Sequence, residues 1–257
     1  MKKCNFIGMG VDAITYGELF EQCDRWLEDK QARSKHVACV NVNCAVEGYL
    51  NPEIAEIFSK ADISGADSMP FVYWIKLLTG KACDRLYAPD IILELCKRSL
   101  EHNYRLYLYG GAEGVPEKMQ LFLERKFPGI NIVGSYSPPF RQLTSSEDRD
   151  ICNSINQSNA DFVIVGLGSP KQDRWMQEHL DKIPGTIMIA SGAAFDFFGG
   201  TINQAPLFIQ KSGFEWLFRL FQDPKRLWKR YTLYNVIFLW MFFLQTVGLK
   251  KFNTHKA

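Results

Sequence analysis

Short apolar runs and longer stretches of helical periodicity alternate along the first 200 residues. Runs rich in β-branched and aromatic residues predict strands at 5–11, 36–42, 61–64, 105–109, 130–136, 162–165 and 186–190. Apolar residues that recur every three or four positions predict helices at 15–29, 51–60, 69–78, 89–101, 116–127 and beyond Thr144. This alternation predicts an α/β fold, with a Rossmann-like, mostly parallel sheet and helices on both faces.

The pattern changes near residue 205, after which only helices are predicted. One helix is expected from Ser212 to Leu220, and a second from Pro224 to about Leu249. The uncharged stretch from Leu233 to Leu249 is shorter and more polar than the roughly 20 apolar residues that span a bilayer. We therefore predict an α/β domain over 1–204 and a helical appendage over 205–257.

Charge and aromatic content set this appendage apart. It carries nine lysines and arginines and only two acids, although the net charge of the whole chain is +2. Eleven of the 35 aromatic residues lie between Phe214 and Phe243. A basic, aromatic helix favours contact with a membrane surface. The alternative is that this helix packs on the domain or on a neighbouring subunit.

The composition excludes several other classes of protein. With 47% hydrophobic and 23% charged residues the chain is globular. Its seven cysteines are scattered without a C-x-x-C pair, so neither a disulfide framework nor a zinc site is indicated, and a reducing cytoplasm is expected. The N-terminus lacks the apolar run of a signal peptide. No nucleic-acid partner is predicted, and a homo-oligomer is left open.

The most informative stretch is 161–175, which predicts a buried strand, a turn and a helix. Gly166 and Gly168 allow a sharp turn, and Pro170 suits the first turn of a helix. The free N–H groups of such a helix start, with Lys171 beside them, favour an anion such as phosphate. Lys171 stands where a dinucleotide fingerprint has its third glycine, and the Gly-Lys-Ser/Thr of a P-loop is missing.

Further polar residues follow other predicted strands. Asn41 and Asn43 follow the second strand, and Asp67 comes just after 61–64. Ligands of open α/β sheets gather at the carboxyl ends of strands. The only D-x-D, at 148–150, falls on a predicted helix and is interpreted as solvated surface, so neither a catalytic divalent cation nor another cofactor is predicted.

These segments together resemble the WecG/TagA/CpsF family of bacterial glycosyltransferases (glycosyltransferase family 26). The resemblance covers most of the chain. The matching pieces are Gly65-Ala-Asp67, Arg85, Tyr109-Gly-Gly111, Val165 to Trp175, Gly192 to Phe197, Ala205-Pro206, Gly213 to Leu220, Pro224-x-Arg226-Leu and Lys229-Arg-Tyr231.

The resemblance implies an inverting transfer of a sugar, commonly N-acetylmannosamine, from a UDP-sugar to a polyprenyl-diphosphate-linked sugar in cell-surface polysaccharide synthesis. It implies a cytoplasmic enzyme, peripheral on the inner face of the cell membrane through its C-terminal helices. Asp67 matches the family's proposed general base. The expected substrate-binding residues are Asn41, Asn43, Arg85, Gly110, Gly111, Gly166, Gly168, Ser169, Lys171, Gln172, Asp196, Arg219, Arg226 and Arg230.

Three alternatives stay open. The chain departs from the family pattern at 41–43, at Ser68 and at 88–90, which are expected to line the sugar pocket, so glucose or another hexose or N-acetylhexosamine remains a candidate donor. The second alternative is a nucleotide-cofactor oxidoreductase, which the absent third glycine disfavours. The third is a non-catalytic, membrane-bound scaffold.

Overall fold

The computed structural model describes residues 3–254, without the side chains of Lys211 and Arg226. Within that range it has twelve helices and eight strands, and the strands are mostly parallel. The predicted α/β class is therefore confirmed. The chain forms two compact units, which are described separately. The first comprises the chain up to Tyr16, Ala38–Tyr87 and the chain from Gln204 onward, and the second comprises Gly17–Val37 and Ala88–Asn203.

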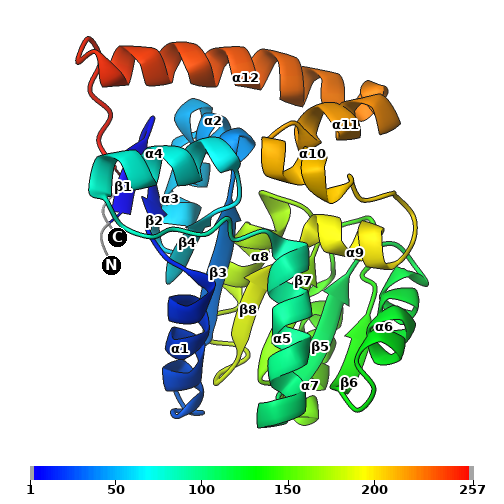
Figure 1. Ribbon diagram of the computed structural model, residues 1–257. Coiled ribbons are helices and arrows are strands. Elements are labelled where there is room, and N and C mark those ends of the chain that lie inside the picture. Colours follow the sequence, from blue (N-terminus) through cyan, green and yellow to red (C-terminus); the bar gives the residue numbers. More distant parts are fainter. Residues whose placement is uncertain (1–2, 255–257) are drawn as a thin grey trace. The chain divides into compact units, whose positions relative to one another are not determined.

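The first unit contains a small sheet and six helices (Figure 1). Its strands are hydrogen-bonded in the order β1-β2-β4-β3, with β1 antiparallel to β2 and β2 parallel to β4. The strand bounds are β1 Lys3–Phe6, β2 Met9–Asp12, β3 Lys35–Val40 and β4 Ile63–Ala66. The helix bounds are α2 Val42–Leu50, α3 Pro52–Ser59, α4 Met69–Thr79, α10 Leu207–Ser212, α11 Glu215–Gln222 and α12 Pro224–Thr246.

Two predictions for this unit were wrong. The segment 5–11, predicted as one strand, is a hairpin of β1 and β2 that turns at Ile7 and Gly8. The strand predicted to reach Val42 ends at Val40, because Asn41 caps a helix that the sequence patterns did not predict. Its side-chain oxygen accepts hydrogen bonds from the backbone N–H groups of Asn43 and Cys44, at 3.1 and 3.2 Å.

The second unit contains five parallel strands in the order β3-β8-β7-β5-β6. Only the first half of β3 takes part in it. The other strands are β5 Arg105–Gly110, β6 Asn131–Tyr136, β7 Phe162–Gly166 and β8 Ile187–Ala190. The helices are α1 Tyr16–Leu27, α5 Ala88–His102, α6 Val115–Lys126, α7 Ser145–Ser158, α8 Lys171–Glu178 and α9 Gly192–Phe198. Most of these elements were predicted to within a few residues, but α9 was not.

Helices cover both faces of this parallel arrangement, as the unbroken apolar runs predict. Tyr107, Val163 and Met188 face α7 and α8, where they form a core with Ile155 and Met176. Successive side chains of a strand point to opposite faces. The alternate positions of the same strands are also buried, and α6 and α9 contact β5 and β7.

The tail begins differently from the prediction. A helix was expected to open at Ser212 and Gly213, but Gly213 instead ends α10 with a left-handed φ of 82°. A residue without a Cβ adopts this conformation at little cost, which makes glycine the usual terminator. The next helix, α11, starts at Glu215.

The long helix α12 follows its predicted course and packs on the first unit. It runs beside α2 (Figure 1). Leu227, Tyr231 and Phe238 are buried, and the Phe238 ring lies 5.6 Å from that of Phe71. One face of the predicted appendage is thus part of the hydrophobic core of this unit. Within residues 3–254, no helix combines the length and apolar character needed to cross a bilayer.

We predict that Phe238→Ala lowers the free energy of unfolding by about 3 kcal/mol, because it leaves a cavity in a packed core. Urea denaturation without lipid measures this change. Phe243→Ala on the same helix is the matched control, because that side chain is 51% exposed, and we expect a change within about 0.5 kcal/mol. Equal effects of the two substitutions would contradict the assignment of the buried face.

Candidate functional site

In the first unit, Asp67 is the centre of the candidate site. It follows β4 directly, and its backbone N–H donates to the Val40 carbonyl at the end of β3, at 2.8 Å. Its side chain is 18% exposed. Among the described residues, its Oδ1 atom is buried and accepts no hydrogen bond. This oxygen therefore has hydrogen-bonding capacity that the described residues do not use.

The environment of Asp67 shifts its proton affinity. Burial raises its pKa from the ordinary value of 3.8 to about 7. The Arg85 guanidinium offsets part of this rise, and the Glu215 carboxylate adds to it. A hydrogen bond with Asn41 and the charge of Arg219 also offset part of the rise. A pKa near neutral pH suits a general base, because the group binds a proton readily and a substantial fraction of it is still ionised.

Arg85 joins Asp67 to the tail. Its Nε lies 3.7 Å from Asp67 Oδ1, and its Nη2 forms an ion pair with Glu215 Oε2 at 2.7 Å. The guanidinium lies over the Tyr87 ring, 4.2 Å from its centroid, and the Tyr87 hydroxyl donates to Glu215 Oε1 at 2.8 Å. Arg85 was predicted to bind substrate, and these contacts show what holds it in place.

Glu215 and Tyr87 were missed as candidate site residues. Glu215 is only 6% exposed, although it opens α11 in a basic tail. Carboxylates are rarely buried unless they are paired. The sequence offered one signal, because Glu215 is an isolated acid among basic and aromatic residues. Its partner Arg85 lies 130 positions away, so the sequence did not reveal the pair.

The two predicted asparagines differ in their roles. The Asn41 oxygen is used in capping α2, whereas Asn43 Oδ1 is buried and accepts no hydrogen bond from any described residue. The hydroxyl of Ser68, one of the departures from the family pattern, is likewise buried without a hydrogen-bond partner in residues 3–254. Polar atoms of this kind are costly to bury, so they favour a bound polar ligand.

The predicted tail arginines have separate environments. Arg219 lies on α11, close enough to lower the pKa of Asp67. Arg230 pairs with Glu47 of α2 at 3.3 Å. The side chain of Arg226 lies outside the described residues, so its expected role in substrate binding remains a prediction.

In the second unit, two glycines that were predicted to bind substrate lie where the ends of β5 and β7 approach closely. Gly110 and Gly166 are paired residues of β5 and β7, and a Cβ on Gly110 would lie 2.5 Å from the Gly166 backbone. The N–H of Gly111 donates to the Gly166 carbonyl at 2.9 Å. A side chain at Gly110 would therefore force these strand ends apart.

The turn after β7 is held by Gln172. Its Oε1 accepts from the Gly168 N–H at 3.0 Å, and its backbone N–H donates to the Gly168 carbonyl at 2.9 Å. This loop includes Ser169 and leads into α8, where Lys171 is exposed in the first turn. The predicted helix start is confirmed, and a positive charge stands beside it.

Asp196 was also predicted to bind substrate. Its backbone carbonyl accepts from the N–H groups of Thr201 and Ile202, and its Oδ1 lies 3.3 Å from the Thr201 hydroxyl. These contacts hold the turn after α9. Ser191, at the end of β8, was missed, although its hydroxyl is buried without a hydrogen-bond partner among the described residues.

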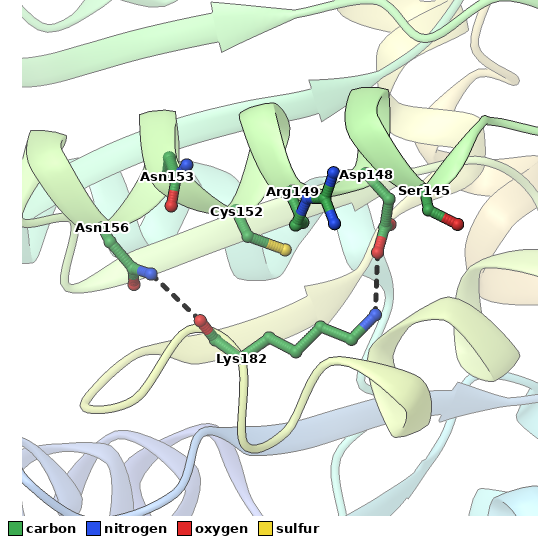
Figure 2. Close-up of a pocket in the computed structure, with 7 residues that line it drawn as sticks. All are labelled: Ser145, Asp148, Arg149, Cys152, Asn153, Asn156 and Lys182. Carbon is green, nitrogen blue, oxygen red and sulfur yellow. Dashed lines mark hydrogen bonds and ion pairs between the residues drawn. The ribbon is translucent and has the colours of Figure 1, made fainter.

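A surface pocket of about 400 Å³ lies away from the predicted site residues of this unit (Figure 2). Asp148 lines it, and its carboxylate accepts from Lys182 at 2.7 Å and lies 2.8 Å from His179 Nε2. The interpretation of Asp148 as solvated surface was therefore wrong. Asp150, the second acid of the D-x-D, is exposed as expected.

Comparison with known proteins agrees with these features. Residues 4–252 match the glycosyl transferase WecG/TagA/CpsF family. The chain belongs to this family. The resemblance inferred from the sequence motifs is thereby confirmed.

Relatives from Bacillus and Staphylococcus share the name N-acetylglucosaminyldiphosphoundecaprenol N-acetyl-beta-D-mannosaminyltransferase. The protein from Bacillus spizizenii (strain W23) is 28% identical over 200 residues, which are 78% of this chain and 76% of the relative. Those from Staphylococcus aureus strains MW2 and NCTC 8325 are 22% identical over 225 residues, 88% of this chain and 87% of theirs. Their names describe a transferase that acts on a polyprenyl-linked sugar.

We predict that Asp67 titrates with a midpoint near its pKa of about 7, so that it is protonated below that pH and ionised above it. Glu215→Gln should lower the midpoint, because it removes a negative charge and leaves Arg85 to act on Asp67 alone. Carbon-13 NMR of labelled aspartate carboxyls measures both values. Glu53→Gln, on the exposed start of α3, should leave the midpoint in place. A wild-type midpoint at the ordinary aspartate value would refute the expected shift.

Proposed function

We propose that this protein transfers a sugar, of the N-acetylmannosamine type, from a UDP-sugar to a polyprenyl-diphosphate-linked sugar, with inversion and with Asp67 as general base. The observation that carries the proposal is the Asp67 carboxylate, with a pKa of about 7 and a buried oxygen that accepts no hydrogen bond from the described residues. The product serves cell-surface polysaccharide synthesis.

The chemistry of Asp67 follows from the weakness of a sugar hydroxyl as a nucleophile. Asp67 takes the hydroxyl proton while the oxygen forms a bond to the anomeric carbon of the donor. The bond from that carbon to the UDP oxygen breaks, and UDP leaves with the bonding electrons. Attack opposite to the leaving group inverts the anomeric centre. Arg85 orients Asp67 and keeps a compensating positive charge beside it.

The leaving UDP gains negative charge that must be stabilised. In the second unit, the backbone N–H groups of the loop after β7 and Lys171 supply positive potential. In the first unit, taken by itself, Arg219 and Arg230 stay candidates for contact with a substrate diphosphate. These groups support departure of UDP without a metal ion.

The names of the curated relatives support the acceptor, a diphosphate-linked N-acetylglucosamine on a polyprenyl lipid, and the N-acetylmannosamine donor. Identities of 22–28% leave glucose or another hexosamine as alternative donors. The unpartnered atoms at Asn43 and Ser68 are the groups in the first unit that would distinguish such sugars.

We predict that Asp67→Asn lowers the turnover number about 10²- to 10⁴-fold, which is the usual contribution of a general base. Transfer from UDP-N-acetylmannosamine to a lipid-linked N-acetylglucosamine acceptor measures the loss. Asp150→Asn, at an exposed acid on α7, is the control and should remain active.

Thermal melting with UDP checks that the Asp67→Asn variant is folded and still binds nucleotide. An active Asp67→Asn protein would refute the role of Asp67 as base. Failure of the wild-type protein to bind UDP would favour the non-catalytic scaffold, and stabilisation by NAD instead would favour the oxidoreductase.

A second part of the proposal is that α12 rests on the cytoplasmic face of the cell membrane. The face of α12 that does not pack on the protein exposes Val236, Leu239, Trp240 and Phe243. Lys225 and Lys229 are exposed at the start of the same helix. An apolar, aromatic face flanked by lysines matches the chemistry of an anionic lipid surface.

We predict that the double variant Trp240→Ser, Phe243→Ser binds anionic phosphatidylglycerol vesicles at least about tenfold more weakly, because burial of each side chain is worth about 1.5–3 kcal/mol. Vesicle sedimentation measures the change. Phe140→Ser removes an aromatic side chain that is 88% exposed in the second unit, and it should bind as the wild type does. Unchanged binding of the double variant would refute docking through this face.

A further inference from the structure

A cluster of three potential metal ligands lies in the second unit, outside the residues assigned to sugar transfer. Asp148 and Cys152 are four residues apart on α7 and therefore share one face of that helix. His179 follows the last residue of α8. One ligand atom from each of these residues lies within 4.8 Å of the other two. We call these three residues the α7–α8 cluster.

The imidazole of His179 is oriented as in many metal sites. Its Nδ1 lies 2.6 Å from the Trp175 carbonyl, which can only accept, so Nδ1 carries a hydrogen. Nε2 then faces Asp148 Oδ1 at 2.8 Å. The ring is 2% exposed and stacks on the Trp175 indole, 4.1 Å between centroids. A metal-binding histidine typically has its second nitrogen held by such a carbonyl.

A cation already occupies part of this cluster. Lys182 Nζ lies 2.7 Å from Asp148 Oδ2 and 3.4 Å from His179 Nε2. Its side chain is 46% exposed, so it can swing into solvent. Figure 2 shows Asp148, Cys152 and Lys182 among the residues lining the pocket of about 400 Å³, through which an ion can enter.

We propose that the α7–α8 cluster binds Zn²⁺ through an Asp148 oxygen, the Cys152 thiolate and His179 Nε2, with a water from the pocket as fourth ligand. The ion takes the place of the Lys182 ammonium. The Cys152 thiol loses its proton to solvent. The hydrogen that His179 Nε2 and Asp148 Oδ1 share is also lost to solvent, so that Nε2 coordinates through its lone pair. A thiolate and an imidazole select zinc over magnesium or calcium, which prefer oxygen ligands alone.

The site links two helices that only tertiary packing brings together. Zinc would join α7 to the end of α8, the helix whose first turn holds Lys171 and Gln172. Its role is structural, so it is separate from the metal-independent sugar transfer proposed above. Bound zinc is therefore expected to raise the melting temperature without taking part in the reaction.

The test uses the full-length protein after chelator treatment, with Zn²⁺ binding measured by calorimetry. Co²⁺ is a spectroscopic probe, because a thiolate ligand produces a charge-transfer absorption band. We expect Cys152→Ser to abolish the band and to weaken Zn²⁺ binding by more than the roughly tenfold typical of an outer-shell change. His179→Gln should weaken binding similarly, and Zn²⁺ should raise the melting temperature of the wild type but not that of the Cys152→Ser and His179→Gln variants.

Lys182→Met is the complementary variant. It should bind Zn²⁺ severalfold more tightly, because the competing ammonium is gone, and this gain cannot arise from misfolding. Asp150→Asn, an exposed acid on α7, and Cys39→Ser, a half-buried thiol, are matched controls that should leave binding unchanged. A Co²⁺ spectrum without a thiolate band, or weaker binding by Lys182→Met, would overturn the proposal.

Discussion

The ion pair between Arg85 and Glu215 is the interaction on which the candidate site of the first unit depends. It joins the loop between α4 and α5 to the first residue of α11, at 2.7 Å and with little exposure of either side chain. Loss of one partner would leave a buried, unpaired charge, which typically costs about 3–5 kcal/mol. Because both groups also act on the pKa of Asp67, the same contact that anchors the tail tunes the proposed base.

Two constraints on the backbone shape the second unit. The ends of β5 and β7 approach so closely that a Cβ on Gly110 would lie 2.5 Å from the Gly166 backbone. The loop that follows is closed by the Gln172 side chain. Gly110, Gly166 and Gln172, which were singled out for binding, thus have a direct structural task, whereas Lys171 is exposed beside the start of α8.

Helix α12 has one apolar face that is buried and another that is exposed. Phe238 and Tyr231 enter the core of the first unit, whereas Trp240 and Phe243 are exposed on the same helix. The helix thus packs on the first unit, which was one of the two predicted alternatives. Its other face is apolar and lies beside exposed lysines. The membrane proposal and the packing alternative therefore apply to different faces of α12.

The sequence by itself determined the α/β class, most element positions and the family, and it singled out Asp67 as the candidate base, because strand and helix periods and short motifs are local properties. The sequence patterns did not predict α2 and α9, and they placed a helix start at Gly213, where α10 ends instead. Local propensities near turns are too weak to decide such boundaries. Tertiary structure alone decided which distant groups meet. Glu215 and Arg85 lie 130 residues apart, and His179 lies 31 residues from Asp148, so no spacing rule reveals them. Burial, which sets the pKa of Asp67, likewise exists only once the chain has folded.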